Sequence, residues 1–239
     1  MSRLFLVRHG QASFFSSNYD QLSDLGRDQA RRLGAWWSGT GQPQATRLVS
    51  GPLVRQRDSH AEFVTGAGVE HPHQLLDGLS EYHALELMTA VIPTLVNAEP
   101  ELAEIALAAV KPGEGQGAAK ERLFRTVTRR WVRGELENPV GIQSFDAFRA
   151  GVEDALETMV EANGPGETTV AFTSGGVVAA AVGWVLGLDH EKTLELSWVV
   201  RNSAVTELRH RFIDGQREVS VFVFNATPHL PSADLITYR

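Results

Sequence analysis

The stretch "TTVAFTSGGVVAAAVGWVLGL", residues 168–188, joins a strand pattern to a helix pattern through a polar residue and two glycines. Residues 168–173 are rich in β-branched and aromatic side chains, which favour a strand. Ser174, Gly175 and Gly176 follow, and the apolar run after them has the spacing of a buried helix. A strand that turns through glycines into a helix N-terminus can hold an anion at that turn.

Short strand and helix patterns alternate along the rest of the chain. Strand patterns lie at 4–7 and 46–51, and 73–81 has the pattern of a strand that leads into a loop. Helix patterns lie at 23–39, 52–66 and 144–163, and a hairpin pattern lies around Asp214-Gly215 at 204–225. Ser23 is the expected N-cap of the first helix, and Pro52 the expected first residue of the second. Continuous apolar strands between helices are typical of parallel sheets covered on both faces. We therefore predict an α/β fold, a three-layer α/β/α sandwich with a mainly parallel central sheet and a helical insertion.

The insertion is the segment 82–137, which carries helical patterns and no convincing strand. We interpret it as a lid within one domain that spans residues 1–239. It offers a ligand two aromatic side chains, Tyr82 and Trp131, and a cluster of arginines at 129, 130 and 133. Such a cluster is either a solvated helix face or a second anion site.

Composition narrows the class of protein. The 239 residues are 43% hydrophobic and 21% charged, which is ordinary globular composition, and there is no cysteine. The net charge of −7 argues against a general nucleic-acid or membrane-surface binder, because both partners are anionic. The N-terminal apolar run is too short for a signal peptide, and no window approaches the ~20 apolar residues of a membrane span. We expect a cytoplasmic protein.

Charged and polar residues stand at the ends of four predicted strands: Arg8, His9, Arg55, Glu81 and Ser174. In open α/β sheets, ligands bind beyond the carboxyl ends of the strands. A histidine there can act as a nucleophile or base, an arginine can bind a phosphate, and a carboxylate can act as a general acid. Any one of these side chains alone could be an ordinary surface residue. Four strand ends together predict one anion-binding crevice.

Ser174 could also be the nucleophile of a serine hydrolase. The strained turn that exposes such a serine needs the pattern G-x-S-x-G, and here Phe172 stands at the first glycine position. The serine-hydrolase hypothesis therefore ranks below phosphate binding.

The motifs that carry these residues resemble those of the histidine phosphatase superfamily, the phosphoglycerate mutase-like proteins. They are "LFLVRHGQAS" (4–13), "VSGPLVRQRDSHAEF" (49–63), "LLDGLSE" (75–81) and "VAFTSGGVVAAAVGWVLGL" (170–188). The resemblance covers most of the chain and is weak in the helical middle. It implies the fold predicted above and a phosphatase that acts on a small phosphorylated molecule.

Residue roles follow from the resemblance alone. It implies that His9 attacks phosphorus and becomes a phosphohistidine, and that Arg8, Arg55 and Gln11 bind the phosphoryl oxygens. It implies that Glu81 protonates the leaving oxygen and then deprotonates the hydrolytic water. No metal or organic cofactor is implied, because fixed cations can neutralise the transferring group. The oligomeric state stays open.

The sequence departs from the family pattern at two places. Ser174 stands where the family has its second histidine and would bind phosphate as a shorter, neutral donor, so we expect reduced activity. Phe15 stands where the family often has an asparagine, with Ser13 and Ser16 as nearby polar residues. His83 is the histidine best placed in the sequence to compensate. The alternative is a pseudo-phosphatase that binds a phosphorylated ligand; a mutase fits less well, because family mutases retain the second histidine.

Overall fold

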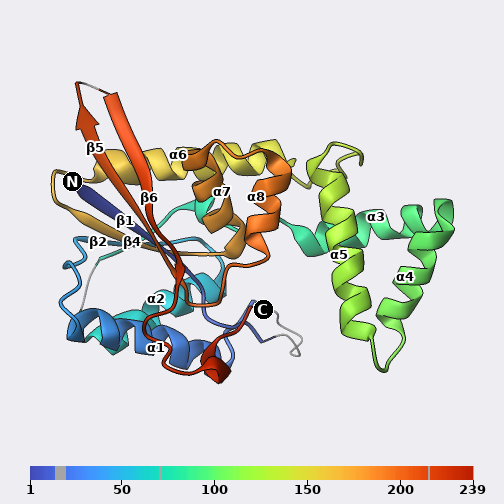
Figure 1. Cartoon of the computed structure of the whole chain (residues 1–239), viewed down its shortest axis with the longest axis horizontal. Coiled ribbons are helices and arrows are strands. Elements are labelled where there is room, and N and C mark those ends of the chain that lie inside the picture. The colour runs from blue at the N-terminus through green and yellow to red at the C-terminus, as the bar shows by residue number, and fades with distance from the viewer. Residues whose placement is uncertain (14–19, 70–71, 215, 239) are drawn as a thin grey trace. The chain divides into compact units, whose positions relative to one another are not determined.

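The computed structural model describes residues 1–13, 20–69, 72–214 and 216–238, and the chain divides into two compact units (Figure 1). One unit combines Met1–Glu81 with Arg149–Arg239 and contains the sheet. The other unit, Tyr82–Phe148, is helical and extends beyond the segment 82–137 that we interpret as the insertion. No helix among the described residues has both the length and the apolar character needed to span a bilayer.

Within the described residues of the first unit, six strands form one sheet in the order β3-β2-β4-β1-β5-β6. Their bounds are β1 (Ser2–Arg8), β2 (Arg47–Ser50), β3 (His73–Leu75), β4 (Thr168–Thr173), β5 (Val205–Ile213) and β6 (Gln216–Ala226). The strands β3, β2, β4 and β1 run parallel, whereas β5 is antiparallel to β1 and to β6. The predicted sheet and hairpin are confirmed; Asp214 has a φ of 52°, and Gly215 lies outside the described residues.

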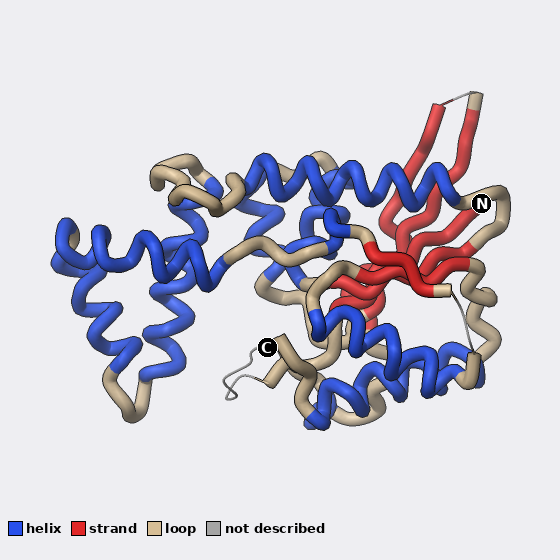
Figure 2. Tube along the Cα trace, turned by 180° about the vertical axis from the view of Figure 1, so that it is seen from behind, coloured by secondary structure: helices blue, strands red, loops and turns tan. Residues whose placement is uncertain are grey.

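Helices cover both faces of this sheet, which confirms the three-layer α/β/α sandwich (Figure 2). The helices α1 (Asp24–Gly39) and α2 (Val54–Ala67) lie on one face. The other face carries α7 (Gly175–Leu186), α8 (His190–Ser197) and the part of α6 (Phe145–Ala162) that begins at Arg149.

The helix starts show how local side chains fix the elements. Ser23 caps α1 as predicted, because its hydroxyl accepts the N–H of Gly26. The expected start of α2 at Pro52 is wrong by two residues. Leu53 is extended at the N-cap position, and the carboxylate of Asp20 accepts the N–H of Val54, so the first helical N–H group is satisfied there.

The turn after β1 packs closely on α1. A Cβ atom added to Gly10 would lie 2.1 Å from the carbonyl oxygen of Gly26, so no other residue fits at position 10 without moving the helix. Aromatic packing beneath α1 reinforces this contact, since the rings of Phe5 and Trp37 meet edge to face at 4.8 Å. This packing fixes the position of the segment that follows β1.

The helical unit is built from α3 (Ala84–Ala98), α4 (Pro100–Val110), α5 (Gln116–Val132) and the first residues of α6. Tyr82 and Trp131 are 7% and 5% exposed, and their rings pack against each other at 5.5 Å. Trp131 also contacts Phe145 and donates its indole N–H to Asn138. The two aromatic side chains that we considered as ligand contacts therefore form part of the core of this unit.

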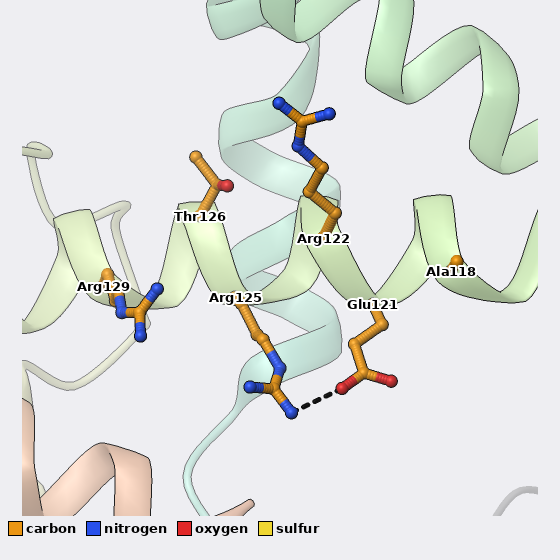
Figure 3. Close-up of a pocket in the computed structure, with 6 residues that line it drawn as sticks. All are labelled: Ala118, Glu121, Arg122, Arg125, Thr126 and Arg129. Atoms are coloured by element: carbon orange, nitrogen blue, oxygen red, sulfur yellow. Dashed lines mark ion pairs between the residues drawn. The ribbon is translucent and has the colours of Figure 1, made fainter.

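Arg125, Arg130 and Arg133 make ion pairs within the helical unit. Arg130 donates both guanidinium nitrogens to the carboxylate of Glu99, at 2.6 and 2.7 Å. On the surface of α5, a shallow hollow is lined by Ala118, Glu121, Arg122, Arg125, Thr126 and Arg129 (Figure 3). Arg125 and Glu121 point the same way there and form an ion pair.

Candidate active site

Four parallel strands end at one edge of the sheet, and this edge gathers the residues singled out in the sequence. Arg8 pairs with Thr173 across β1 and β4, and the N–H of His9 donates to the carbonyl of Thr173 at 2.8 Å. His9 and Ser174 are thus the first residues beyond two neighbouring parallel strands. Their backbones lie side by side at the carboxyl edge, where α/β proteins bind ligands.

His9 is buried, with 5% of its surface exposed, and both ring nitrogens have partners. Nδ1 lies 2.7 Å from the carbonyl oxygen of Gly10, and Nε2 lies 3.2 Å from Nε of Arg55. A carbonyl can accept but not donate and a guanidinium can donate but not accept, so the proton is on Nδ1 and the lone pair is on Nε2. Burial first, and then the charges of Arg55 and Arg8, hold the pKa of His9 well below its usual value.

The backbone of His9 is hydrogen-bonded to Asn202 and Ser203, which the sequence analysis did not single out as site residues. The carbonyl of His9 accepts the N–H of Ser203 at 3.1 Å and the side-chain amide of Asn202 at 3.3 Å. Ser203 has a φ of 58°, and its hydroxyl is hydrogen-bonded to Nε2 of His229 at 2.9 Å. A non-glycine residue in this region of backbone space often marks a functional constraint.

Arg55 is the second residue of α2 and so lies in its first turn. Its Nη1 donates to Asp20 at 2.8 Å while its Nε faces His9. The same Asp20 carboxylate accepts the N–H of Val54, so it fixes both the helix start and the guanidinium. Sequence reasoning missed Asp20, because one aspartate in a loop 35 residues from Arg55 carries no local signal.

Arg8 lies against the start of α7. Its Nη1 donates to the carbonyls of Val200 and Tyr238, the latter at 2.9 Å. A Cβ atom added to Gly175 would lie 3.5 Å from Nε of Arg8. The guanidinium therefore lies next to the N-terminus of α7, a combination that suits an anion.

Glu81 also reaches the glycine turn. Its Oε2 accepts the N–H of Gly176 at 3.0 Å, so the carboxylate lies at the N-terminus of α7 although it is far from this helix in sequence. Glu81 follows the short 3-10 helix Asp77–Leu79, which connects β3 to this edge. The structure therefore brings Arg8, His9, Arg55, Glu81 and Ser174 to the same edge of the sheet.

Ser174 is fully buried and has a partner that sequence reasoning missed. Gln56 donates its Nε2 to the hydroxyl oxygen of Ser174 and to the carbonyl of Leu79, both at 2.8 Å. Gln56 is itself fully buried. Nothing in a single sequence distinguishes this glutamine from a solvated helix residue, because its partners lie 23 and 118 residues away.

Gln11 has a different environment from the other predicted residues. Its Oε1 accepts a hydrogen bond from the hydroxyl of Ser23, the N-cap of α1, at 2.9 Å.

Of the other residues considered in the sequence, His83 is exposed at the N-cap of α3 in the helical unit. Phe15 and Ser16 lie outside the described residues.

Across the part of the chain that the structure describes, no three His, Cys, Asp or Glu side chains are grouped as metal ligands.

The sequence itself matches the model of the histidine phosphatase superfamily (branch 1) over residues 4–91 and 84–223. The chain belongs to this superfamily. The family predicted from the motifs is thereby confirmed, whereas the model match does not test the individual residue roles.

Several solved structures resemble the chain over nearly its whole length. A mycobacterial glucosyl-3-phosphoglycerate phosphatase in complex with VO3 is 20% identical and has a TM-score of 0.61, with 94% of this chain and 99% of that chain covered. A mutant phosphoserine phosphatase from Entamoeba histolytica, in complex with phosphoserine, is 17% identical and has a TM-score of 0.62, with 96% and 100% covered. At these identities the likeness shows the fold. No protein with a curated description matches the sequence.

Proposed function

We propose that this histidine phosphatase superfamily member hydrolyses phosphate monoesters through a phosphohistidine on His9. The observation that carries the proposal is the state of the His9 ring. Its Nδ1–H is bound to the Gly10 carbonyl, which leaves the lone pair on Nε2. The lowered pKa of His9 keeps this nitrogen unprotonated at neutral pH, as a nucleophile must be.

In the first proposed step, Nε2 of His9 attacks phosphorus in line with the leaving oxygen. The phosphorus–oxygen ester bond breaks as the phosphorus–nitrogen bond forms. The resting contact from Arg55 to Nε2 is replaced by a contact from Arg55 to a phosphoryl oxygen, which releases the lone pair. Two guanidinium groups, from Arg55 and Arg8, neutralise the transferring group. Glu81, protonated in the reactive form, gives its proton to the leaving oxygen.

In the second proposed step, a water molecule attacks the phosphohistidine. Glu81, now a carboxylate, takes a proton from that water, and the phosphorus–nitrogen bond breaks. Inorganic phosphate leaves, and His9 returns to its neutral form with the proton on Nδ1. The proposal assigns no step to a metal or an organic cofactor.

We propose that Ser174 binds the phosphoryl group in place of the family's second histidine. A neutral hydroxyl is a weaker donor to an anion than an imidazolium. Loss of one transition-state donor costs about 100- to 1000-fold in kcat, and a retained hydroxyl contact would make the loss smaller. We therefore propose reduced but real turnover, on a small phosphorylated substrate of the kind that both similar structures are named for.

The test is trapping of the phosphoenzyme from an aryl phosphate at about pH 5 to 8. The reaction is stopped with a denaturing alkaline quench, because the phosphorus–nitrogen bond of a phosphohistidine hydrolyses in acid. Wild type is expected to form an acid-labile adduct and to turn over, and His9→Ala to do neither. Ser174→Ala is expected to retain the adduct at a lower rate. Absence of both adduct and turnover in pure wild type overturns the proposal.

A second candidate is a pseudo-phosphatase that binds a phosphorylated ligand without turnover. The observation that favours it is Ser174, which is fully buried and hydrogen-bonded by Gln56. Binding of inorganic phosphate by wild type, with turnover appearing only in variants that carry Ser174→His, would favour this candidate.

A further inference from the structure

Gln56 is anchored at three points, and these anchors fix which way its amide faces. Its Oε1 accepts the N–H of Leu53 at 3.1 Å, and its Nε2 donates to the carbonyl of Leu79 at 2.8 Å. A backbone N–H cannot accept and a carbonyl cannot donate, so the flipped amide would break both bonds. Nε2, not Oε1, therefore faces Ser174.

This orientation decides whether the Ser174 hydroxyl accepts or donates in its hydrogen bond with Gln56. The amide of Gln56 donates to the Ser174 oxygen at 2.8 Å, so one lone pair is used and the O–H remains to be donated elsewhere. The neighbouring carbonyl of Leu79 already accepts Gln56 and the hydroxyl of Thr173, the latter at 2.8 Å. Both lone pairs of that carbonyl are occupied, so it is a poor acceptor for Ser174.

The space around the amide fits it closely. A Cβ atom added to Gly51 would lie 2.1 Å from Oε1 of Gln56 and 2.6 Å from the carbonyl oxygen of Leu79. Gly51, in the turn after β2, thus leaves the space that the side-chain amide of Gln56 occupies. Gln56 also follows Arg55 directly, so the first turn of α2 sends one side chain to His9 and the next to Ser174.

We propose that Gln56 is a positioning residue for phosphoryl transfer, an inference that rests on the proposed function of this edge. Gln56 holds the Ser174 hydroxyl as a hydrogen-bond donor to the phosphoryl group on His9. A chain in which an amide donates to a hydroxyl and the hydroxyl donates to an anion is cooperative, because each bond polarises the next. The glutamine thereby strengthens the neutral donor at 174.

A double-mutant cycle on Gln56→Met and Ser174→Ala tests this role. Methionine keeps the volume of glutamine and removes the amide. Each single variant is expected to lower kcat for an aryl phosphate by roughly 10- to 100-fold, and the double variant to be little worse than Ser174→Ala. The product of the two single-variant losses in kcat should therefore exceed the loss in the double variant by about 10-fold or more. Independent, multiplying effects would overturn the proposal, because a merely structural glutamine would act equally in both backgrounds.

Two further measurements keep the outcome clear. Thermal unfolding is followed in all four proteins, and if Gln56→Met does not fold, Gln56→Leu carries the cycle, since it is also apolar and removes the donor. Orthovanadate affinity is measured across the same cycle and is expected to show the same coupling without turnover. If His9→Ala leaves turnover intact, the proposed function fails. If vanadate affinity shows no coupling in a protein that does bind vanadate, the role of Gln56 fails alone.

Discussion

Arg55 donates its Nε–H to Nε2 of His9 across 3.2 Å, so a fixed positive charge lies against the ring nitrogen that holds the lone pair. The contact has two consequences. It disfavours a proton on that nitrogen, and it holds the guanidinium at the place where the proposed mechanism puts the phosphoryl group. Asp20 binds the same guanidinium through Nη1, at 2.8 Å, and so fixes its direction.

The first prediction concerns the titration of His9. Burial is the main cause of its lowered pKa and the charge of Arg55 the next, so Arg55→Met should raise the pKa without restoring the usual value of 6.5. Because the nucleophile is the deprotonated form, the acid limb of kcat/KM in wild type should lie well below pH 6.5. The measurement is the pH dependence of the imidazole ¹⁵N chemical shifts. A His9 pKa at or above 6.5 in wild type would contradict the assignment.

The second prediction separates the two proposed steps at Glu81. Glu81→Gln removes a group that gives and takes a proton, which is worth about 100- to 10,000-fold in rate. Alkyl phosphates, whose leaving oxygen needs a proton, should lose that factor in kcat. With an aryl phosphate the first step should survive and the phosphoenzyme should accumulate. The matched control is Asp77→Asn, at an exposed carboxylate four residues earlier in the chain. Equal losses in the rate of phosphoenzyme formation from both substrates would argue against an acid role.

Much of the fold could be predicted because its signals are local. The alternation of strands and helices, the N-cap Ser23 and the glycine turn at 175 and 176 each follow from neighbouring residues. The candidate residues could be predicted as a group because parallel strands place their carboxyl ends together. Arg55 is a clear example, since a strand followed by a helix start specifies its place.

The remaining contacts could not be predicted because they join residues far apart in the chain. Gln56 reaches Ser174 across 118 positions, and Asn202 reaches the carbonyl of His9 across 193. Each is an ordinary polar residue until the fold is complete. Trp131 shows the opposite case, because a large aromatic side chain that could serve a ligand is equally suited to a core, and the helical unit uses it there.

The third prediction is a loss of stability in acid to which His60, which is not one of the candidate site residues, contributes. Burial lowers the pKa of His60 from 6.5 to about 4, with a smaller contribution from His73, on which it stacks at 3.9 Å. The unfolded chain therefore binds a proton on His60 below pH 6.5, whereas the native state resists it down to about pH 4. The contribution of His60 to the free energy of unfolding should be complete above pH 6.5 and should be lost as the pH falls from 6.5 to 4.

His60→Phe tests this prediction, because phenylalanine keeps a flat ring against His73 and does not titrate. Nε2 of His60 is buried and has no hydrogen-bond partner in the described part of the chain, so no bond is lost at that atom. The free energy of unfolding, measured with urea, should fall less between pH 6.5 and 4 in this variant than in wild type, by about 1–3 kcal/mol. The exposed His83, changed in the same way, is the control. An unchanged slope in His60→Phe would show that a different group causes the loss of stability.

The fourth prediction concerns restoration of a histidine at position 174. The Ser174 hydroxyl oxygen lies 2.8 Å from the amide of Gln56, and both side chains are fully buried. An imidazole at 174 is several atoms larger than a hydroxymethyl group, and a well-packed interior does not absorb such an increase without strain of roughly 1–3 kcal/mol. Ser174→His alone should therefore lower the melting temperature and give little gain in kcat.

The double variant Gln56→Ala, Ser174→His should behave differently, because the shorter side chain at 56 makes room for the ring. We expect it to recover stability relative to Ser174→His and to exceed wild type in kcat by about 10-fold or more, since a charge-assisted donor then faces the phosphoryl group. Gln56→Ala alone, which should be slower than wild type, is the matched control. A fully stable and highly active Ser174→His single variant would show that the glutamine does not restrict this position.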